Sequence, residues 1–345
     1  MENTMPSGRA VVRFAAYACI LLLVLLAVAI TFTVGWRPFI GPKKRALTDR
    51  HFETTPERLK RGEYLVEHVS LCYGCHTSFD ARGRDVPQLT EAKGAGRALT
   101  DESGLRVVAP NITPDPETGI GRWTDDELAR AIREGIGRDG RALFPMMPYQ
   151  NFRQMSDEDL ASVIVYLRAQ PAVYHKLPRT HLPLPVSLLI NNVPQPVVGP
   201  VAAPNADDPV AYGKYLVTGV GICGGCHTPR DAHGQPIAGM YLGGGNIFDE
   251  SGHPVASANI TPDPSGISYY DQTTFVQMMR TGAVRGRKLN VMMPTWAFDG
   301  MTDHDLKAMF AYLRTVPPAH HRIDNTEKAT LCPIDGHMHG LGAAN

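Results

Sequence analysis

The sequence predicts an all-α protein in which two copies of one small helical domain follow a single membrane-spanning helix. Three observations support this fold class. A Cys-x-x-Cys-His pattern occurs twice, the segments around its two copies match in order, and one long stretch near the N-terminus carries no charge. The 345 residues leave room for two or three domains. The formal net charge of zero gives no electrostatic attraction to nucleic acid, so no nucleic-acid partner is expected.

Residues 14–35 contain no charged side chain and, as a helix, span roughly 33 Å at about 1.5 Å per residue, which is enough to cross a bilayer. A cleaved signal peptide is the competing interpretation. Its apolar region usually covers about 7–15 residues, however, and the small-residue site at 27–29 lies inside the run. We therefore predict an uncleaved anchor at 14–35, with residues 1–13 in the cytoplasm.

Five segments follow the anchor. A connector rich in Pro and Gly is expected to act as a tether that lifts the first domain off the membrane. Between the domains, a linker with eight prolines is expected to be a stiff spacer. The predicted boundaries are 36–55 for the tether, 56–170 for the first domain, 171–207 for the linker, 208–316 for the second domain and 317–345 for a C-terminal tail.

The repeated pattern occupies residues 72–76 and 223–227 and is the attachment signature of a c-type haem. Two thiols one turn apart can form thioethers to one porphyrin, and the histidine that follows can bind the iron. A structural zinc site would need a second Cys/His pair nearby, and a thioredoxin-like redox pair would not need the histidine. We predict two covalently bound haem c groups, attached at Cys72, Cys75, Cys223 and Cys226, with His76 and His227 as axial ligands.

A second repeated pattern, Met-Met-Pro, follows each haem motif after about seventy residues. A thioether opposite histidine raises the reduction potential and closes the sixth position on the iron. Either methionine of a pair, Met146 or Met147 and Met292 or Met293, could supply this sulfur. We favour Met147 and Met293 because each adjoins the proline.

Each copy begins with a helix that carries a small residue, Gly62 or Gly213, and ends with a helix that carries an aromatic one, Tyr166 or Tyr312. Glycine allows a second helix to approach closely, and we expect the aromatic residue to pack against it. Capping patterns that predict helix starts lie at Thr124, Ser156, Asp271 and Thr302.

The sequence Asn-Ile-Thr-Pro-Asp occurs at 111–115 and again at 259–263. Pro and Asp here indicate tight turns. Turn chemistry alone is one interpretation, and the other is that Asn111 and Asn259 bind a haem propionate. The stretch from the first haem motif to Ala109 is expected to be a surface loop because it is rich in Gly, Asp and Arg.

Two cysteines remain outside the haem motifs. Cys19 lies in the apolar run, and Cys332 is expected to be an unpaired thiol without function, with pairing to a partner chain as the alternative. The tail is expected to be solvated and polar and to lie on the second domain or meet a partner. Metal binding by its His-Met-His sequence is the other possibility. The tail contains the histidines His320, His321, His337 and His339.

Over residues 56–316 the order of these motifs resembles the cytochrome c subunits of membrane-bound alcohol and gluconate dehydrogenases. The resemblance implies class I cytochrome c folds, with His76 and Met147 on one iron and His227 and Met293 on the other. Such subunits typically carry three haem domains and can exchange electrons with quinone. This chain has two such domains and an N-terminal anchor, so its partner enzyme and any reaction with quinone stay open.

The expected function is that of a membrane-anchored dihaem cytochrome. It would relay single electrons from the catalytic subunit of a periplasmic dehydrogenase to another cytochrome or a terminal oxidase. Haem is attached to this signature outside the bacterial inner membrane, so we expect the haem domains in the periplasm, although the basic residues at 37–45 alone would favour the cytoplasm. The alternative is a dihaem enzyme, of peroxidase or thiosulfate-oxidising type, with one displaceable axial ligand.

Overall fold

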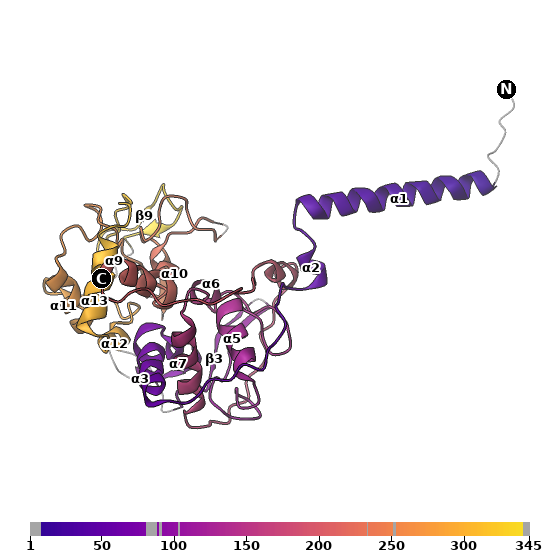
Figure 1. Ribbon diagram of the computed structural model, residues 1–345. Coiled ribbons are helices and arrows are strands. Elements are labelled where there is room, and N and C mark those ends of the chain that lie inside the picture. Colours follow the sequence, from indigo (N-terminus) through magenta and orange to yellow (C-terminus); the bar gives the residue numbers. More distant parts are fainter. Residues whose placement is uncertain are drawn as a thin grey trace.

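The computed structural model describes residues 8–80, 88–89, 92–102, 104–232, 234–250 and 253–340. The fold is mostly helical, and two helical units lie side by side while a single long helix projects away from them (Figure 1). The predicted cytoplasmic N-terminus falls partly outside the described residues, which begin at Gly8.

The projecting helix is α1 (Gly8–Phe32). Within it, Val11–Phe32 is the one helix of the described chain that is long and apolar enough to cross a membrane, with a mean hydropathy of 2.7 and none of its most apolar window buried. The predicted apolar helix is confirmed, although it starts and ends a few residues earlier than expected. Its large apolar side chains have no protein partner that would cover them.

The two units repeat the same order of helices and share one hairpin, and each has one further strand pair that the other lacks. A first helix passes through a π-helical turn into the short haem-motif helix, a hairpin follows, and three further helices complete the unit. The first unit contains α3 (Pro56–Tyr64), η1 (Leu65–Val69), α4 (Cys72–His76), β1 (Phe79–Asp80), β2 (Gln88–Leu89), β3 (Arg97–Glu102), β4 (Leu105–Ala109), α5 (Asp125–Glu134), α6 (Tyr149–Phe152) and α7 (Asp157–Arg168). The second contains α9 (Pro209–Lys214), η3 (Tyr215–Val220), α10 (Cys223–His227), β5 (Ile247–Glu250), β6 (His253–Ala256), α11 (Gln272–Thr281), β7 (Ala283–Val284), β8 (Arg287–Lys288), α12 (Thr295–Phe298) and α13 (Asp303–Leu313).

The hairpins correct the expectation of a plain surface loop before Ala109. Strands β3 and β4 pair antiparallel, with Ala98 opposite Val108. Gly104 lies between them at φ +82°. Polar side chains on the exposed edge hide the apolar alternation, so composition alone indicated a loop. The equivalent pair β5 and β6 occurs in the second unit.

The helix crossing expected from the glycines is confirmed in both units. A Cβ atom on Gly62 would lie 2.1 Å from the carbonyl oxygen of Ser162 and 2.5 Å from Cβ of Tyr166, and one on Gly213 would lie 1.9 Å from the carbonyl oxygen of Ala308. Helices α3 and α9 therefore touch α7 and α13 backbone to backbone. The predicted caps also form, at Thr124, Ser156, Asp271 and Thr302.

A near-symmetrical set of hydrogen bonds joins the two units. The hydroxyl of Tyr64 donates to Asp305 at 2.8 Å and accepts from the Thr302 amide at 3.1 Å. The hydroxyl of Tyr215 donates to Asp159 at 2.6 Å and accepts from the Ser156 amide at 3.0 Å. In each case the first helical segment of one unit binds the start of the last helix of the other. Burial, followed by the neighbouring carboxylate, raises the pKa of both tyrosines, so both hydroxyls keep the proton that they donate.

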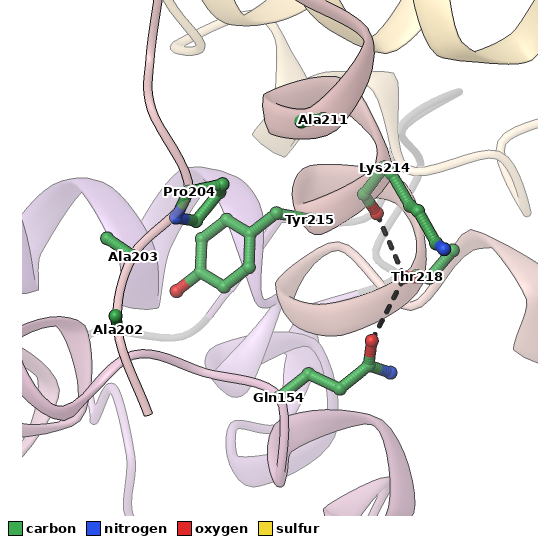
Figure 2. A pocket seen from close by; sticks show the side chains of 8 residues that line it. All are labelled: Gln154, Ala202, Ala203, Pro204, Ala211, Lys214, Tyr215 and Thr218. Atoms are coloured by element: carbon green, nitrogen blue, oxygen red, sulfur yellow. Dashed lines mark hydrogen bonds between the residues drawn. The ribbon is translucent and has the colours of Figure 1, made fainter. Parts of the chain in front are cut away.

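The units contact each other directly, so the linker is not the element that holds them apart. Its stiffness stays a prediction. The linker runs along their junction, where Figure 2 shows the ring of Tyr215 beside residues 202–204. In the same place the hydroxyl of Thr218, in the second unit, donates to the side chain of Gln154 in the first unit at 3.4 Å. The same hydroxyl lies 2.9 Å from the Lys214 carbonyl, which also accepts from it (Figure 2).

The tether is also bound to the first unit and does not hang free. The guanidinium of Arg45 binds the buried carboxylates of Asp126 at 2.6 Å and Glu134 at 2.7 Å, and the amide of Thr48 donates to Asp126 at 2.7 Å. Closer to the anchor, helix α2 (Arg37–Ile40) packs against the linker segment formed by α8 (Val186–Leu189) and η2 (Ile190–Asn192). That this segment lifts the first unit off the membrane stays a prediction.

The tail lies on the second unit, as one of the two alternatives predicted, but it is not a solvated strand of polar residues. Strands β9 (Thr330–Leu331) and β10 (Met338–His339) form a small hairpin. The amide of Asn325 exchanges two hydrogen bonds with the backbone of Ala256, at 2.8 and 2.9 Å. The side chains of His321 and His339 are buried because the hairpin folds over them.

Candidate haem sites

The two haem motifs have the same local backbone. The residue before each motif helix, Leu71 or Ile222, adopts a left-handed conformation with φ of 53° or 49°. Such a conformation is costly for a branched apolar residue and is usually retained only where the surrounding structure requires it. It ends the π-helical turn and starts a new helical turn, so that both cysteines of a motif lie on one short helix.

The histidine of each motif is oriented by a backbone carbonyl from the same place in each unit. Nδ1 of His76 lies 2.7 Å from the carbonyl oxygen of Pro110, and Nδ1 of His227 lies 2.7 Å from that of Ala258. Because Nδ1 donates its proton there, Nε2 presents a lone pair, which is the form that binds iron. Burial lowers the pKa of both imidazoles, which keeps them neutral. Sequence reasoning missed these carbonyls, although both precede the repeated Asn-Ile-Thr.

The motif cysteines lie in apolar surroundings. Burial raises the pKa of Cys72 and of Cys223 to about 12, so both are protonated thiols. Each packs against the apolar core of the protein. Their covalent attachment to haem stays a prediction.

The exposure of the methionines differs within the first pair. Met146 has half of its side-chain surface exposed, whereas Met147 is partly buried against the apolar core that also contacts Cys72. In the second unit Met293 packs against the same core as Cys223. This burial favours Met147 and Met293 for a site inside the fold, and their role as ligands stays a prediction.

The asparagines of the repeated turn are occupied within the protein. Oδ1 of Asn111 accepts from the amide and the hydroxyl of Thr113, and its Nδ2 donates to Thr118 at 2.9 Å and to the Val173 carbonyl at 2.7 Å. Asn259 makes the equivalent bonds in the second unit. These contacts agree with the turn interpretation, since both amide protons of Asn111 already have acceptors.

An arginine beside the first motif supports the presence of an anionic group there. The guanidinium of Arg97 donates to the carbonyl of Gly74 at 3.2 Å and lies over the ring of Phe79 at 4.9 Å. Its Nε is buried and makes no hydrogen bond to the part of the chain that the structure describes. A buried donor without an acceptor is costly unless a ligand supplies one. A haem carries two propionates, so the donor set at this motif fits the group.

The two motifs approach each other across the junction of the units. Burial raises the pKa of the Cys226 thiol, and the nearby Cys75 thiol of the other unit adds to this rise. Phe79, just after the first motif, meets Trp296, just after the second Met-Met-Pro, edge to face at 6.0 Å between ring centres. Nothing in the order of the residues indicated this contact, because it depends on how the units pack.

Known proteins share this arrangement of motifs. The profile of the cytochrome c family matches residues 59–171. The chain is 30% identical to the diheme cytochrome c-type protein of Cereibacter sphaeroides over 74% of this chain and 85% of that protein. It is also 30% identical to the cytochrome c subunit of the quinone alcohol dehydrogenase of Gluconobacter oxydans, over 82% of this chain and 60% of the relative. With the fructose dehydrogenase cytochrome subunit of Gluconobacter japonicus it shares 32% identity, over 75% of this chain and 52% of the relative. The chain thus spans little more than half the length of these two dehydrogenase subunits.

Proposed function

Because the chain belongs to the c-type cytochrome family that includes dihaem cytochromes and the cytochrome c subunits of dehydrogenases, we propose that it relays single electrons between a dehydrogenase and a later carrier. The donor is the catalytic subunit of a periplasmic dehydrogenase. The acceptor is another cytochrome or a terminal oxidase. Two covalently bound haem c groups supply the one-electron iron couples for this relay.

One observation carries the proposal: both units hold the same pair of motif cysteines and the same histidine with Nδ1 fixed at 2.7 Å from a backbone carbonyl. Cys72 and Cys75 hold the first group, and Cys223 and Cys226 the second. His76 and His227 present Nε2 to the irons, with Met147 and Met293 as the opposite ligands. The orientation of the histidine is fixed and the methionine is packed in the core, so the two ligands move little when the iron changes its oxidation state. A small rearrangement suits an electron carrier.

The junction between the units keeps the relay path short. Tyr64 and Tyr215 fix each unit against the last helix of the other, and Phe79 contacts Trp296 between the two motifs. Such contacts hold the relative orientation of the two sites. The chain itself therefore provides a rigid pair of sites, and a soluble shuttle between them is not needed.

The apolar helix α1 places this relay at a membrane. We propose a single-pass anchor in the bacterial inner membrane, with both haem-binding units on the periplasmic side. The bound tether keeps the first unit close to the membrane surface, since Arg45 fastens it to α5 only ten residues or so after the anchor. Electron partners in or on the same membrane would then reach the first unit by lateral diffusion.

A methionine exchange tests the ligand set. Met147→Ala should abolish the weak far-red absorption band of a Met-ligated ferric haem at one of the two sites and lower the potential of that haem. Met146→Ala, at the exposed neighbour, is the matched control and should change neither property. The opposite result, with the band lost only in the Met146 variant, would move the ligand by one residue.

Two measurements test the function itself. The reduced protein should not bind carbon monoxide rapidly at either haem, because both irons carry two protein ligands, and rapid binding at one haem would instead support the dihaem-enzyme alternative. Copurification of the anchored chain from detergent-solubilised membranes should recover a dehydrogenase subunit whose substrate reduces both haems. Recovery of an active dehydrogenase that leaves the haems oxidised would contradict the proposed donor.

A further inference from the structure

Four side chains from the C-terminal tail form a compact buried cluster outside the haem sites. The cluster consists of His321, Cys332, Asp335 and His339, and one potential ligand atom from each lies within 4.8 Å of the others. The side chains of His321, Asp335 and His339 are 1%, 0% and 7% exposed. We propose that this cluster binds one zinc ion, which fastens the tail to the second haem-binding unit.

The distances between the potential ligand atoms are close to those of a tetrahedral centre: two of the three below fall in the expected range, and the His339–Asp335 distance is shorter. Nε2 of His321 lies 3.3 Å from Sγ of Cys332 and 3.7 Å from Oδ2 of Asp335, and Nε2 of His339 lies 3.0 Å from the same oxygen. Zinc bonds of about 2.0–2.3 Å place neighbouring ligands about 3.3–3.7 Å apart in a tetrahedron. Two imidazoles, a thiolate and a carboxylate form a donor set that zinc accepts, and a hard carboxylate in place of a thioether favours zinc over copper.

The surrounding structure orients these ligands. Nδ1 of His321 lies 3.0 Å from the Gly243 carbonyl, so its Nε2 lone pair faces the cluster. The amide of Ile334 donates to Sγ of Cys332 at 3.4 Å, which holds the sulfur in place. Backbone forms the floor of the cluster, since a Cβ on Gly245 would lie 2.5 Å from Oδ2 of Asp335.

The carboxylate of Asp335 is buried within the cluster. Its ion-pair partners among the described residues are the imidazoles of His321, His337 and His339, at 3.7, 3.8 and 3.0 Å. Burying a carboxylate is costly unless an opposite charge lies near it, and a zinc ion would supply that charge. Bound to zinc, Asp335 and a Cys332 thiolate would contribute two negative charges, which the ion neutralises.

The first unit supplies an internal comparison. His175 is the counterpart of His321, because its Nδ1 lies 2.9 Å from the Ala95 carbonyl just as that of His321 lies near Gly243. Among the described residues, the one cluster of three or more metal-ligating groups lies in the second unit. The fold thus orients an imidazole in both copies, and the tail hairpin adds three ligands to one of them.

At this site Cys332 has a function, and only His339 of the His-Met-His sequence is a ligand. The site also gives the tail a structural role. Gly243 accepts from His321, and the next residue, Gly244, donates its amide to the carbonyl of His227 at 2.7 Å. A metal at the cluster therefore stiffens the segment that contacts the second haem motif.

Metal analysis of the full-length protein in detergent tests the site. After incubation with zinc and desalting, we expect about one zinc per two covalent haems, and X-ray absorption at the zinc edge should show one sulfur at about 2.3 Å with nitrogen or oxygen neighbours at about 2.0 Å. His321→Gln and Cys332→Ser should each weaken zinc binding at least about 100-fold. His175→Gln is the matched control and should retain the metal.

Haem content and the visible spectrum, which should stay as in the wild type, establish that each variant is folded. The proposal is overturned if the zinc-loaded protein shows no sulfur neighbour, or if His321→Gln and Cys332→Ser bind zinc as tightly as His175→Gln. Copper in place of zinc at the same ligands would overturn the choice of metal.

Discussion

Replacing Gly62 by alanine tests the helix crossing on which each haem-binding unit is built. The added Cβ would lie 2.1 Å from the Ser162 carbonyl oxygen and 2.5 Å from Cβ of Tyr166. The first atom belongs to the backbone and the second is bonded directly to it, so neither can move away as the end of a flexible side chain could. An ordinary contact of about 3.2 Å would push α3 and α7 apart by about 1 Å, in a core that is packed at crystal density.

Overpacking of this kind costs about 3 kcal/mol at the upper end of the usual range, and the better helix propensity of alanine returns about 1 kcal/mol. We therefore expect Gly62→Ala to lower the free energy of unfolding by about 2 kcal/mol, which corresponds to a fall in Tm of about 8 °C for a unit of this size. Gly213→Ala should cost at least as much, because its Cβ would lie 1.9 Å from a backbone oxygen.

Thermal unfolding of the full-length protein followed by far-ultraviolet circular dichroism measures this effect, with covalent haem content checked beforehand. Gly74→Ala is the matched control, since it adds a Cβ in a helix of the same unit, and that Cβ meets its nearest neighbour, Cβ of Leu71, at an ordinary 3.7 Å. A Gly62→Ala protein that melts at or above the wild-type temperature would refute the close crossing of α3 and α7.

Two further predictions concern contacts around the first unit. Tyr64→Phe removes the 2.8 Å hydrogen bond to Asp305 and should destabilise the junction of the units by about 1.5–3 kcal/mol in denaturant unfolding, whereas Tyr212→Phe, which loses only a 3.5 Å contact to the same carboxylate, should cost less. Burial alone would raise the pKa of Asp126, but the hydrogen bonds of Arg45 and of the Thr48 amide outweigh it and lower that pKa. This carboxylate therefore adds stability above its unfolded pKa of about 3.9 and loses that contribution as the pH falls through its lower folded value. The difference in stability between wild type and Asp126→Asn should be full above about pH 5 and shrink toward pH 2, and a difference independent of pH would contradict the ion pair.

The local parts of the fold follow from the sequence because they depend on neighbours in the chain. The haem motifs, the helix caps at Thr124 and Ser156, and the glycines that face a tyrosine all lie where their spacing predicts. The apolar run also forms the expected helix. Each of these features depends only on residues within one or two turns of a helix, or on the absence of a side chain at a glycine.

The sequence did not predict the hairpin β3–β4, because this hairpin does not depend on neighbours in the chain alone. Its strands gain their stability by pairing with each other and by resting on the unit, and their polar edge masks the alternation that would reveal a strand. The carbonyls of Pro110 and Ala258 were missed because any residue can supply a backbone acceptor. Only the position of the chain in space makes them partners of the haem-motif histidines.

From the sequence it follows that two copies of one unit come after an apolar helix, because each Cys-x-x-Cys-His motif occupies only five consecutive residues and the apolar run is continuous. How the copies meet depends on the tertiary structure, since Tyr64 binds a carboxylate 241 residues later in the chain. The same holds for the cluster of four metal-ligating side chains in the tail. Those contacts join segments that are far apart in the chain, and the order of the residues does not indicate that they meet. The contacts form because packing the two units together is energetically favourable.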